Sequence, residues 1–560
     1  MSDYYNLGSH TRPITTNVPD AQVWFDRGLM WLYGYNHEEA VTCFRKAVEL
    51  DEGCVMAHWG IAYGLGCNYN KEWKVFSSRD IPKVLSKARA AIAQGMTNLE
   101  KVTPVEQALV QAVEKRFQSE STAENPVDED ILYDWNDAYA DAMRTVYQAF
   151  PDDWDVATLF AEALMNRTPW KLWNLHTGEP AEGADTLEAI EVLERGLSQV
   201  EETGAAPHPG LHHLYIHLME MSPHPERALR VADTLRELVP DSGHLKHMSS
   251  HIDILCGHYY EAVQSNNRAI VANDKFLAQA GELNEYTFYR AHDIHFKIYA
   301  AMLLGQYTTA LEGANQMLAL AHDDLLRMER PPMAFTLEGS VSMKVHVLVR
   351  FGKWQEILDE PFPENKELYC NTTAMLHYAK GIAHATLGNV AAADAERTAF
   401  KVAQGNLHKH RYIFNNTCAD ILEIAEAMLN GEVEYHKGNY DIAFEHLRHA
   451  VYLDDNLHYA EPWGWMMPTR HALGALLLAQ GHVDEATAIY RADLGLDNTL
   501  TRPQQHPDNV WSLQGYVACL EQQGKQDEAT AMRMRLDVVK ARADVDIAVS
   551  CFCAAKSCCA

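Results

Sequence analysis

Basic charge is scarce in this chain. Its 560 residues include 77 acidic and 47 basic ones, which gives a formal net charge of −30. A protein that binds the phosphate backbone of a nucleic acid needs a basic surface, and an anionic membrane attracts polybasic segments. The composition therefore argues against a nucleic-acid partner and against a membrane-surface partner. The acidic excess is typical of a surface that keeps a protein soluble.

Targeting signals and long apolar runs are also missing. The N-terminal residues MSDYYNLGSHTRP lack the basic and apolar regions of a signal peptide, and no uninterrupted apolar run reaches the length that spans a bilayer. The eleven cysteines are scattered singly until the last ten residues, which is the usage of reduced intracellular proteins. We therefore expect a cytoplasmic protein.

Common catalytic motifs are absent as well. The sequence has no G-x-S-x-G elbow, no Walker A loop and no H-E-x-x-H helix. No stretch alternates as a β-strand does, and Gly64–Leu65–Gly66 lies in no strand–helix unit that would bind a dinucleotide. These absences argue against an α/β-hydrolase, a P-loop nucleotide-binding protein and a zinc protease of the H-E-x-x-H type, and they exclude a dinucleotide-binding fold as far as a sequence can.

Helical repeats fill most of the chain. The segment AQVWFDRGLMWLYGYNHEEAVTCFRKAVELD carries the tetratricopeptide pattern, with small residues where paired helices approach and aromatic residues between them: Trp24, Gly28, Ala40, Phe44 and Ala47. Gly34, Tyr35 and Asn36 are predicted to form the turn between the two helices. Similar helix–turn–helix units follow. We predict an all-α tetratricopeptide-repeat superhelix from about Asp20 to Leu536, without sheet. A superhelix of this length can be open or can coil tightly enough to enclose a chamber.

The predicted domain limits follow from this pattern. Residues 1–20 form an N-terminal extension, residues 21–540 form the repeat superhelix, and residues 541–560 form a cysteine-rich tail. The tail holds Cys551, Cys553, Cys558 and Cys559, which suit a soft metal or acylation. A mobile tail with no fixed role is the preferred interpretation, and we expect it to be dispensable for the main site.

Histidines recur at helical spacing between residues 213 and 295. His213 and His217 are four residues apart, and Glu220 follows three residues later. A second segment holds His244, His247 and His251 at spacings of three and four. Such spacings place each set on one face of a helix. His247 follows His213 by 34 residues, and His251 follows His217 by the same interval, which is the tetratricopeptide period.

The repeat phase places these residues on the inner surface of the array. The first helix of each pair lines the concave surface of such arrays. Counted from the packing alanines Ala228, Ala262 and Ala310, the inward stripe of three repeats holds eight polar residues: His213, His217, Glu220, His244, His247, His251, His292 and His295. Adjacent inner helices lie about 8–10 Å apart, so imidazoles from neighbouring repeats can meet at one ion.

A metal site is the best interpretation of this stripe. A lone inner histidine is usually a hydrogen-bonded core residue, but seven would each need partners for both ring nitrogens. The predicted ligands are His213, His217, His244, His247, His251 and His292, with His295 slightly outside. Imidazoles suit copper or zinc, and Glu220 with two histidines would suit iron. Either some histidines orient ligands or move protons, or two ions bind close together.

Those motifs resemble a family of large tetratricopeptide-repeat proteins of bacteria and fungi that lack a settled general function. The resemblance covers nearly the whole chain and includes the opening FDRGLMWLYGYNHEEA, the H-x-x-x-H-x-x-[DE] helix, the H-x-x-H-M-x-S-H-I helix and the late segment YAEPWGWMMPTRHALGALLLAQG. Relatives often have proline in place of Ser249 and aspartate in place of Glu220. The resemblance implies the fold, the site position and a metalloenzyme, without naming the reaction.

Three classes of function follow. The first is a metal-dependent oxidoreductase, with copper favoured and iron possible, acting on an organic small molecule in the concave groove. The second is a zinc-dependent hydrolase or lyase with Glu220 as the catalytic base. The third is a non-catalytic interaction scaffold, which fits poorly because peptide-binding repeats usually present Lys, Arg and Asn. The late cluster Tyr459, Glu461, Trp463 and Arg470 either covers a chamber mouth or, as we favour, packs the C-terminal repeats.

Overall fold

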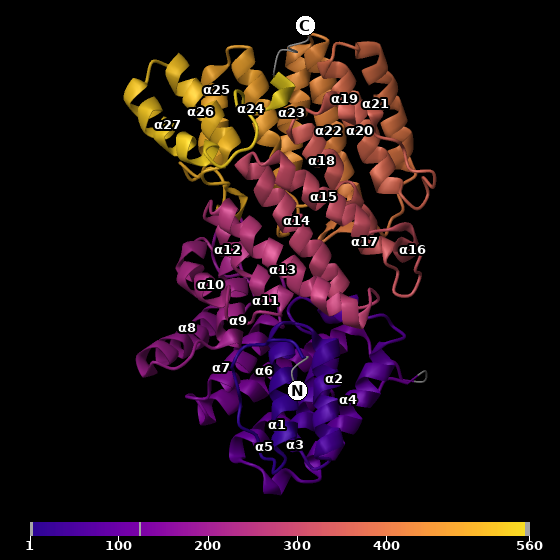
Figure 1. The fold of residues 1–560 in the computed structure, drawn as a ribbon, viewed down its shortest axis with the longest axis vertical. Helices are drawn as coiled ribbons and strands as arrows, with labels where there is room; N and C mark the ends of the chain where they lie inside the picture. Colours follow the sequence, from indigo (N-terminus) through magenta and orange to yellow (C-terminus); the bar gives the residue numbers. More distant parts are fainter. Residues whose placement is uncertain (1–3, 123–124, 555–560) are drawn as a thin grey trace. The chain divides into compact units, whose positions relative to one another are not determined.

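The computed structural model describes residues 4–122 and 125–554, and nearly all of them lie in helices or in the turns between helices. The chain divides into two compact units. The first comprises residues 1–252 and 271–287, and the second comprises residues 253–270 and 288–560. Consecutive helices joined by short turns pack against each other, for example α20 with α21 and α22 with α23 (Figure 1). The prediction of an all-α repeat array is confirmed.

The first unit contains the N-terminal repeats and the predicted histidine helices. Its helices are α1 (Pro19–Tyr33), α2 (His37–Leu50), α3 (Val55–Leu65), α4 (Ile81–Met96), α5 (Pro104–Val113), α6 (Glu129–Ala149), α7 (Trp154–Met165), α8 (Thr186–Thr203), α9 (Pro209–Glu220), α10 (Leu229–Leu235) and α11 (Gly243–His247). Short 3₁₀ turns lie at Trp73–Val75, Leu99–Lys101, Glu114–Arg116 and Pro225–Ala228. Residues of α12 (Ser249–Leu255), α13 (Tyr259–Ala280) and α14 (Tyr286–Leu304) fall in both units.

The second unit continues the helical array. Its further helices are α15 (Tyr307–Leu320), α16 (Asp323–Leu326), α17 (Ala334–Val341), α18 (Met343–Arg350), α19 (Trp354–Asp359), α20 (Cys370–Thr386), α21 (Val390–Gly405), α22 (Cys418–His436), α23 (Tyr440–Asp455), α24 (Thr469–Ala479), α25 (Val483–Asp493), α26 (Val510–Gln522) and α27 (Gln526–Lys540). Two 3₁₀ turns lie at Arg502–Gln504 and Phe552–Ala554. The one two-stranded hairpin among the described residues pairs β1 (Tyr412–Ile413) with β2 (Asn416–Thr417), a short departure from the predicted absence of sheet.

The small residues of the first repeat act as predicted. A Cβ atom on Gly28 would lie 2.5 Å from the Phe44 ring, and one on Gly60 would lie 2.7 Å from the same ring. Phe44 on α2 therefore packs directly on the backbones of α1 and α3. The packing alanines Ala228, Ala262 and Ala310 are all fully buried, so they hold the helix pairs in close contact.

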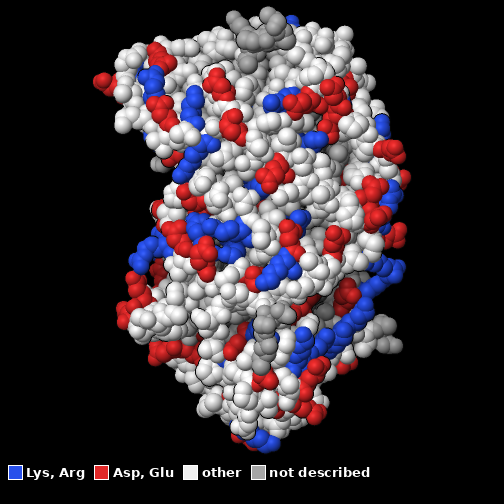
Figure 2. All heavy atoms as spheres, viewed as in Figure 1, with Lys and Arg blue, Asp and Glu red and all other residues white. Residues whose placement is uncertain are grey.

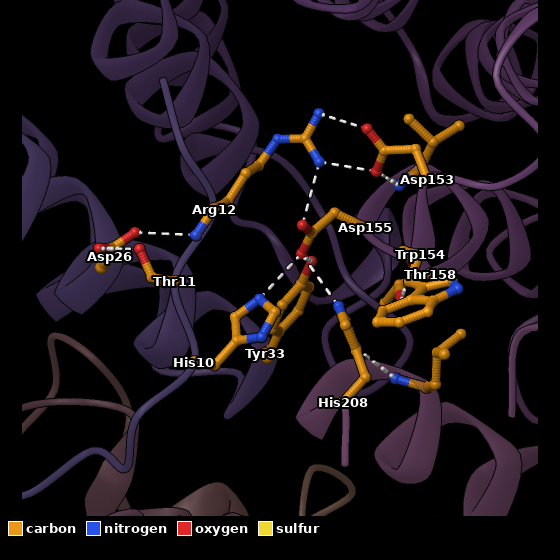
Figure 3. A network of polar contacts seen from close by, with 12 residues as sticks. His10, Thr11, Arg12, Asp26, Tyr33, Asp153, Trp154, Asp155, Thr158 and His208 are labelled. Atoms are coloured by element: carbon orange, nitrogen blue, oxygen red, sulfur yellow. Dashed lines mark hydrogen bonds and ion pairs between the residues drawn. The ribbon is translucent and has the colours of Figure 1, made fainter. Parts of the chain in front are cut away.

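The N-terminal extension, which we call the strap, contacts α1, α7 and the start of α9 through a network of polar side chains (Figure 3). Arg12 donates to Asp155 at the start of α7 over 3.0 Å, and Tyr33 donates to the same carboxylate over 2.5 Å. The Nε2 atoms of His10 and His208 each lie 3.1 Å from Asp155 Oδ1. The strap is therefore joined to the start of α7 and to the residue that caps α9.

The described part of the cysteine-rich tail packs on the second unit. Ser550 is buried, its carbonyl accepts from Arg350 over 2.8 Å, and its hydroxyl lies 2.5 Å from the Tyr490 hydroxyl. Ile547 is fully buried, and Cys551 is disulfide-bonded to Cys553. Cys558 and Cys559 lie outside the described residues.

Charged residues of both signs are interspersed on the face shown in Figure 2. Within the described ranges, no helix is long and apolar enough to cross a membrane.

Candidate metal centre

Helix α9 begins in a way that fixes the direction of its histidines. His208 is the N-cap, its side chain accepts from the backbone N–H of Leu211, and Pro209 holds the first helical position. Both features are typical of helix starts. The following 12 residues form one helix in which His213, His217 and Glu220 share a face and are at most 1% exposed.

The second histidine segment is divided between two short helices. Helix α11 ends at His247, Met248 is a turn residue, and α12 starts at Ser249. Gly243 opens α11 so close to α13 that a Cβ atom would lie 1.9 Å from the side chain of Asn273. The close approach of α11 requires glycine at this position. His244, His247 and His251 are buried despite the break.

Three of the predicted histidines converge in the first unit. One ring nitrogen from each of His213, His217 and His244 lies within 4.8 Å of the others. The Nε2 atoms of His213 and His244 are 3.0 Å apart. With metal–nitrogen bonds of about 2.0–2.1 Å, such a group has the dimensions of one ion site. We call it the three-histidine group.

The outer nitrogens of two of these rings are held by acceptors. His213 hydrogen-bonds to the backbone of Tyr33, while its Nε2 faces His244. His217 directs Nδ1 at Glu220 Oε1 over 3.1 Å. Metal-binding histidines usually donate their other ring N–H to a carbonyl or carboxylate, which fixes the tautomer with the lone pair toward the ion. This arrangement favours Nε2 as the ligand atom.

Glu220 joins the three-histidine group to a second pair. Its other oxygen, Oε2, lies 2.8 Å from His251 Nδ1. His251 Nε2 in turn lies 2.7 Å from His247 Nε2. His251 is thus in close polar contact with Glu220 through Nδ1 and with His247 through Nε2. We call this chain of contacts, from His247 through His251 to Glu220, the relay.

Aromatic rings enclose the three-histidine group. Tyr35 lies 4.5 Å from the ring of His213, 5.4 Å from that of His244 and 5.9 Å from that of His217. Tyr69 and Trp170 lie 5.1 and 6.1 Å from the His217 ring.

Two of these aromatic residues have a left-handed backbone. Tyr35 has φ of 54° and Trp170 has φ of 60°, a conformation that non-glycine residues rarely adopt. In the Gly34–Asn36 turn the neighbouring glycine has an ordinary φ of −91°. Such strain is characteristic of functional sites, where the surroundings hold a residue in place.

Burial keeps the His213 imidazole neutral. It lowers the pKa of His213 to about 3, with a smaller contribution from the charge on His247. A neutral imidazole offers a lone pair, so His213 can bind a metal without first losing a proton near pH 7.

The structure therefore brings together six of the predicted site residues in the first unit: His213, His217, Glu220, His244, His247 and His251. His292 and His295 belong to the second unit. There His292 stacks on Phe414 at 5.0 Å, and burial lowers the pKa of His295 to about 3. The assignment of His292 as a ligand stays a prediction.

The late segment packs within the second unit. Tyr459, Glu461 and Trp463 line a small cavity with Tyr299 and His506, and Arg470 pairs with Asp455. Tyr35, Tyr69 and Trp170 were not predicted as site residues. The turn at Tyr35 was predicted, but only the tertiary structure reveals which residue of the turn takes the left-handed conformation.

A second histidine–aspartate group, His10, Asp155 and His208, also has ligand atoms within 4.8 Å of one another. Its hydrogen bonds identify it as a structural clamp. His208 Nδ1 accepts from the Leu211 N–H, so Nε2 carries the proton and donates to Asp155. Asp155 also holds Arg12. The His208 nitrogen that faces the carboxylate has no lone pair to offer an ion.

Comparison with known proteins identifies the repeat. Residues 22–54 match the family model described as tetratricopeptide repeat. No curated protein is similar enough to the chain to count as a match.

Solved structures of low identity cover most of the chain. They include a human IFIT1 dimer with m7Gppp-AAAA, at 11% identity over 91% of this chain and 95% of that chain with a TM-score of 0.32. Yeast Tom70 is 12% identical over 92% of this chain and 99% of its own, with a TM-score of 0.27. The fold assignment rests on the helix pairs of the structure and on the repeat match: the chain is an all-α array of helix pairs with a tetratricopeptide repeat at residues 22–54.

Proposed function

We propose that the three-histidine group binds one transition-metal ion and that the protein is a metal-dependent oxidoreductase acting on a small organic molecule. The observation that chiefly supports this proposal is the convergence of three buried imidazoles, with ring nitrogens within 4.8 Å of one another. The acceptors on the outer nitrogens of His213 and His217 support Nε2 ligation. His213, His217 and His244 would hold the ion, which would supply the redox chemistry.

The donor set favours copper. Three imidazoles suit copper or zinc, whereas an iron site of the two-histidine type needs a carboxylate ligand. Glu220 already contacts His217 through one oxygen and His251 through the other, so it is engaged in orienting imidazoles. The same contacts weigh against Glu220 as the base of a zinc hydrolase, because a base must reach the substrate or its water.

The chain's own groups supply proton movement and substrate positioning. The relay from His247 through His251 can carry a proton as far as the Glu220 carboxylate, which also orients His217. Tyr35, Tyr69 and Trp170 surround the group and exclude water from it. A planar organic substrate would stack against such rings.

The test is to load purified full-length protein separately with Cu(II), Fe(II) and Zn(II). We expect tight Cu(II) binding, an electron paramagnetic resonance signal with nitrogen hyperfine structure, and reduction by ascorbate followed by reoxidation in air. Preferential Zn(II) binding with a copper form that does not cycle would support the hydrolase instead. If the folded protein binds none of the three metals, both enzyme interpretations fail and the non-catalytic scaffold is the one that remains.

A further inference from the structure

A second buried polar cluster lies in the second unit, and the proposed function does not use it. We call it the Trp465 cluster. Its six members come from four helices and the segment between α23 and α24: His295, His346, Arg350, Tyr378, Glu432 and Trp465. None is more than 4% exposed. Polar side chains buried to this extent normally have hydrogen-bond partners.

The members of the cluster lie together. The Trp465 ring meets the His346 ring edge-on at 4.9 Å and the Tyr378 ring edge-on at 5.5 Å. Arg350 and Glu432 interact electrostatically, and each of them also interacts with Tyr378. His295 interacts in the same way with His346. Helices α14, α18, α20 and α22 thus present polar groups to one region.

Each member has at least one polar atom without a hydrogen-bond partner among the described residues. The atoms are His295 Nε2, His346 Nδ1 and Nε2, Arg350 Nε, Tyr378 Oη, Glu432 Oε2 and Trp465 Nε1. A buried polar atom that loses its water and gains no partner destabilises the fold. Seven such atoms in one cluster would together oppose folding strongly, which points to an occupant that satisfies them.

The neighbouring network shows that this interior can satisfy its polar groups. Asp493 accepts from four side chains: His471, His506, Asn509 and Ser512. His471 also accepts from Arg350 Nη1 over 2.8 Å. Arg350 is therefore positioned from one side by the Asp493 network, while its Nε belongs to the cluster.

The cluster presents more donors than acceptors. The Nε1 of Trp465 and the Nε of Arg350 can only donate, and Tyr378 has a hydroxyl proton to offer. Burial raises the pKa of Glu432 to about 8, so at neutral pH its carboxyl group is also a donor. Burial lowers the pKa of Arg350 to about 9, which leaves a positive charge at neutral pH. A ligand with a negatively charged oxygen complements this set.

We propose that the Trp465 cluster is a binding site for a small monocarboxylic acid. Its carboxylate would accept from Arg350 Nε and Trp465 Nε1, and its remainder would lie against Tyr378 and His346. His295, whose other ring nitrogen hydrogen-bonds to the backbone of Trp463, offers an acceptor for a hydroxyl group on the ligand. A 2-hydroxy acid therefore fits the cluster better than a simple alkyl acid.

The test uses full-length protein purified in buffers free of carboxylates. The protein is denatured and the released small molecules are identified by mass spectrometry. In parallel, the Tm of the native protein is measured with sodium acetate, sodium lactate and sodium chloride at equal ionic strength. We expect either a stoichiometric released organic acid or a rise in Tm with acetate and lactate beyond that with chloride.

Two conservative variants assign the effect to the cluster. Trp465→Phe and Tyr378→Phe each remove one donor and should weaken the acetate and lactate response by roughly tenfold in apparent affinity. Trp73→Phe in the first unit, which loses a hydrogen bond to Asn136, is the matched control and should respond as wild type does. The proposal is overturned if no acid is released and the carboxylates act like chloride. It is also overturned if both cluster variants release as much acid, and respond to the carboxylates as strongly, as the wild type.

Discussion

At the scale of single residues, Glu220 determines how the candidate metal centre is oriented. Its two oxygens contact His217 and His251, and it is fully buried. A carboxylate accepts at both oxygens, whereas an amide accepts at one and donates at the other. Glu220→Gln would therefore force one imidazole to reverse its tautomer and place a proton on the inward nitrogen.

This change should weaken copper binding by about 10–100-fold without unfolding the protein. A competition titration against a copper chelator measures the affinity, and a thermal melt checks the fold. Glu226→Gln is the control, because Glu226 forms a similar but exposed pair with His224 and should leave the affinity unchanged. Equal copper affinity for wild type and Glu220→Gln would contradict the orienting role.

Contacts between individual side chains of the site could be predicted from the sequence where the two residues are close together in the chain. Spacing alone placed Glu220 beside His217, because residues three apart share a helix face. The repeat period aligned His247 with His213, whereas the structure places the Nε2 of His244 3.0 Å from that of His213. The contact between Glu220 and His251 and the left-handed backbone of Tyr35 depend on how separate helices and turns meet. No local pattern in the sequence encodes them.

At the scale of elements, the N-terminal strap fixes the start of α9. Asp155 joins Arg12 of the strap, Tyr33 of α1 and the α9 cap His208. Burial by itself would raise the pKa of Asp155, but hydrogen bonds from His10 and His208 and the charge of Arg12 hold it well below its usual range. The carboxylate is therefore charged in the folded protein at neutral pH.

Asp155→Asn should lower the free energy of unfolding by about 3 kcal/mol, because it leaves a buried guanidinium with less compensation. The free energy of unfolding of the variant and of the wild type is measured by denaturant titration, followed by a spectroscopic signal from the first unit. The control Asp152→Asn removes an exposed partner of Arg195 and should cost less than about 1 kcal/mol. A loss at Asp155 no larger than at Asp152 would show that the strap does not hold α9.

Element boundaries were predicted less completely than element types. Gly-centred turns and the 34-residue phase indicated the helix pairs. The break at Met248 between α11 and α12 and the hairpin at Tyr412–Thr417 were not predicted. Both are set by packing with neighbouring segments, such as the close approach of Gly243 to Asn273.

At the scale of the whole molecule, buried neutral histidines should make the metal-free protein sensitive to acid. Burial lowers the pKa of four of them to about 3 and of two more to about 4: His37, His213, His295 and His346, then His212 and His471. An unfolded histidine takes up a proton near pH 6.5, and these folded ones do so only below pH 4. Their stability contribution is therefore complete above pH 6.5 and is lost as the pH falls.

Each such histidine reduces the free energy of unfolding by about 1.4 kcal/mol per pH unit below pH 6.5. Six together should bring acid unfolding above pH 5. Circular dichroism of the metal-free protein between pH 7.5 and pH 4 measures the acid unfolding. The six histidines lie in both units, so both units should lose helical signal. A helical signal that stays constant down to pH 4.5 would refute the expectation.

The central claim is that the three-histidine group binds one metal ion. The most direct measurement is copper content per chain, by mass spectrometry after loading and gel filtration, for His213→Ala, His217→Ala and His244→Ala. His247→Ala tests the relay, and exposed His224→Ala is the control. We predict one copper per chain in wild type, His224→Ala and His247→Ala, and little copper in the other three, all while folded. Full copper in folded variants of all three group histidines would contradict the account.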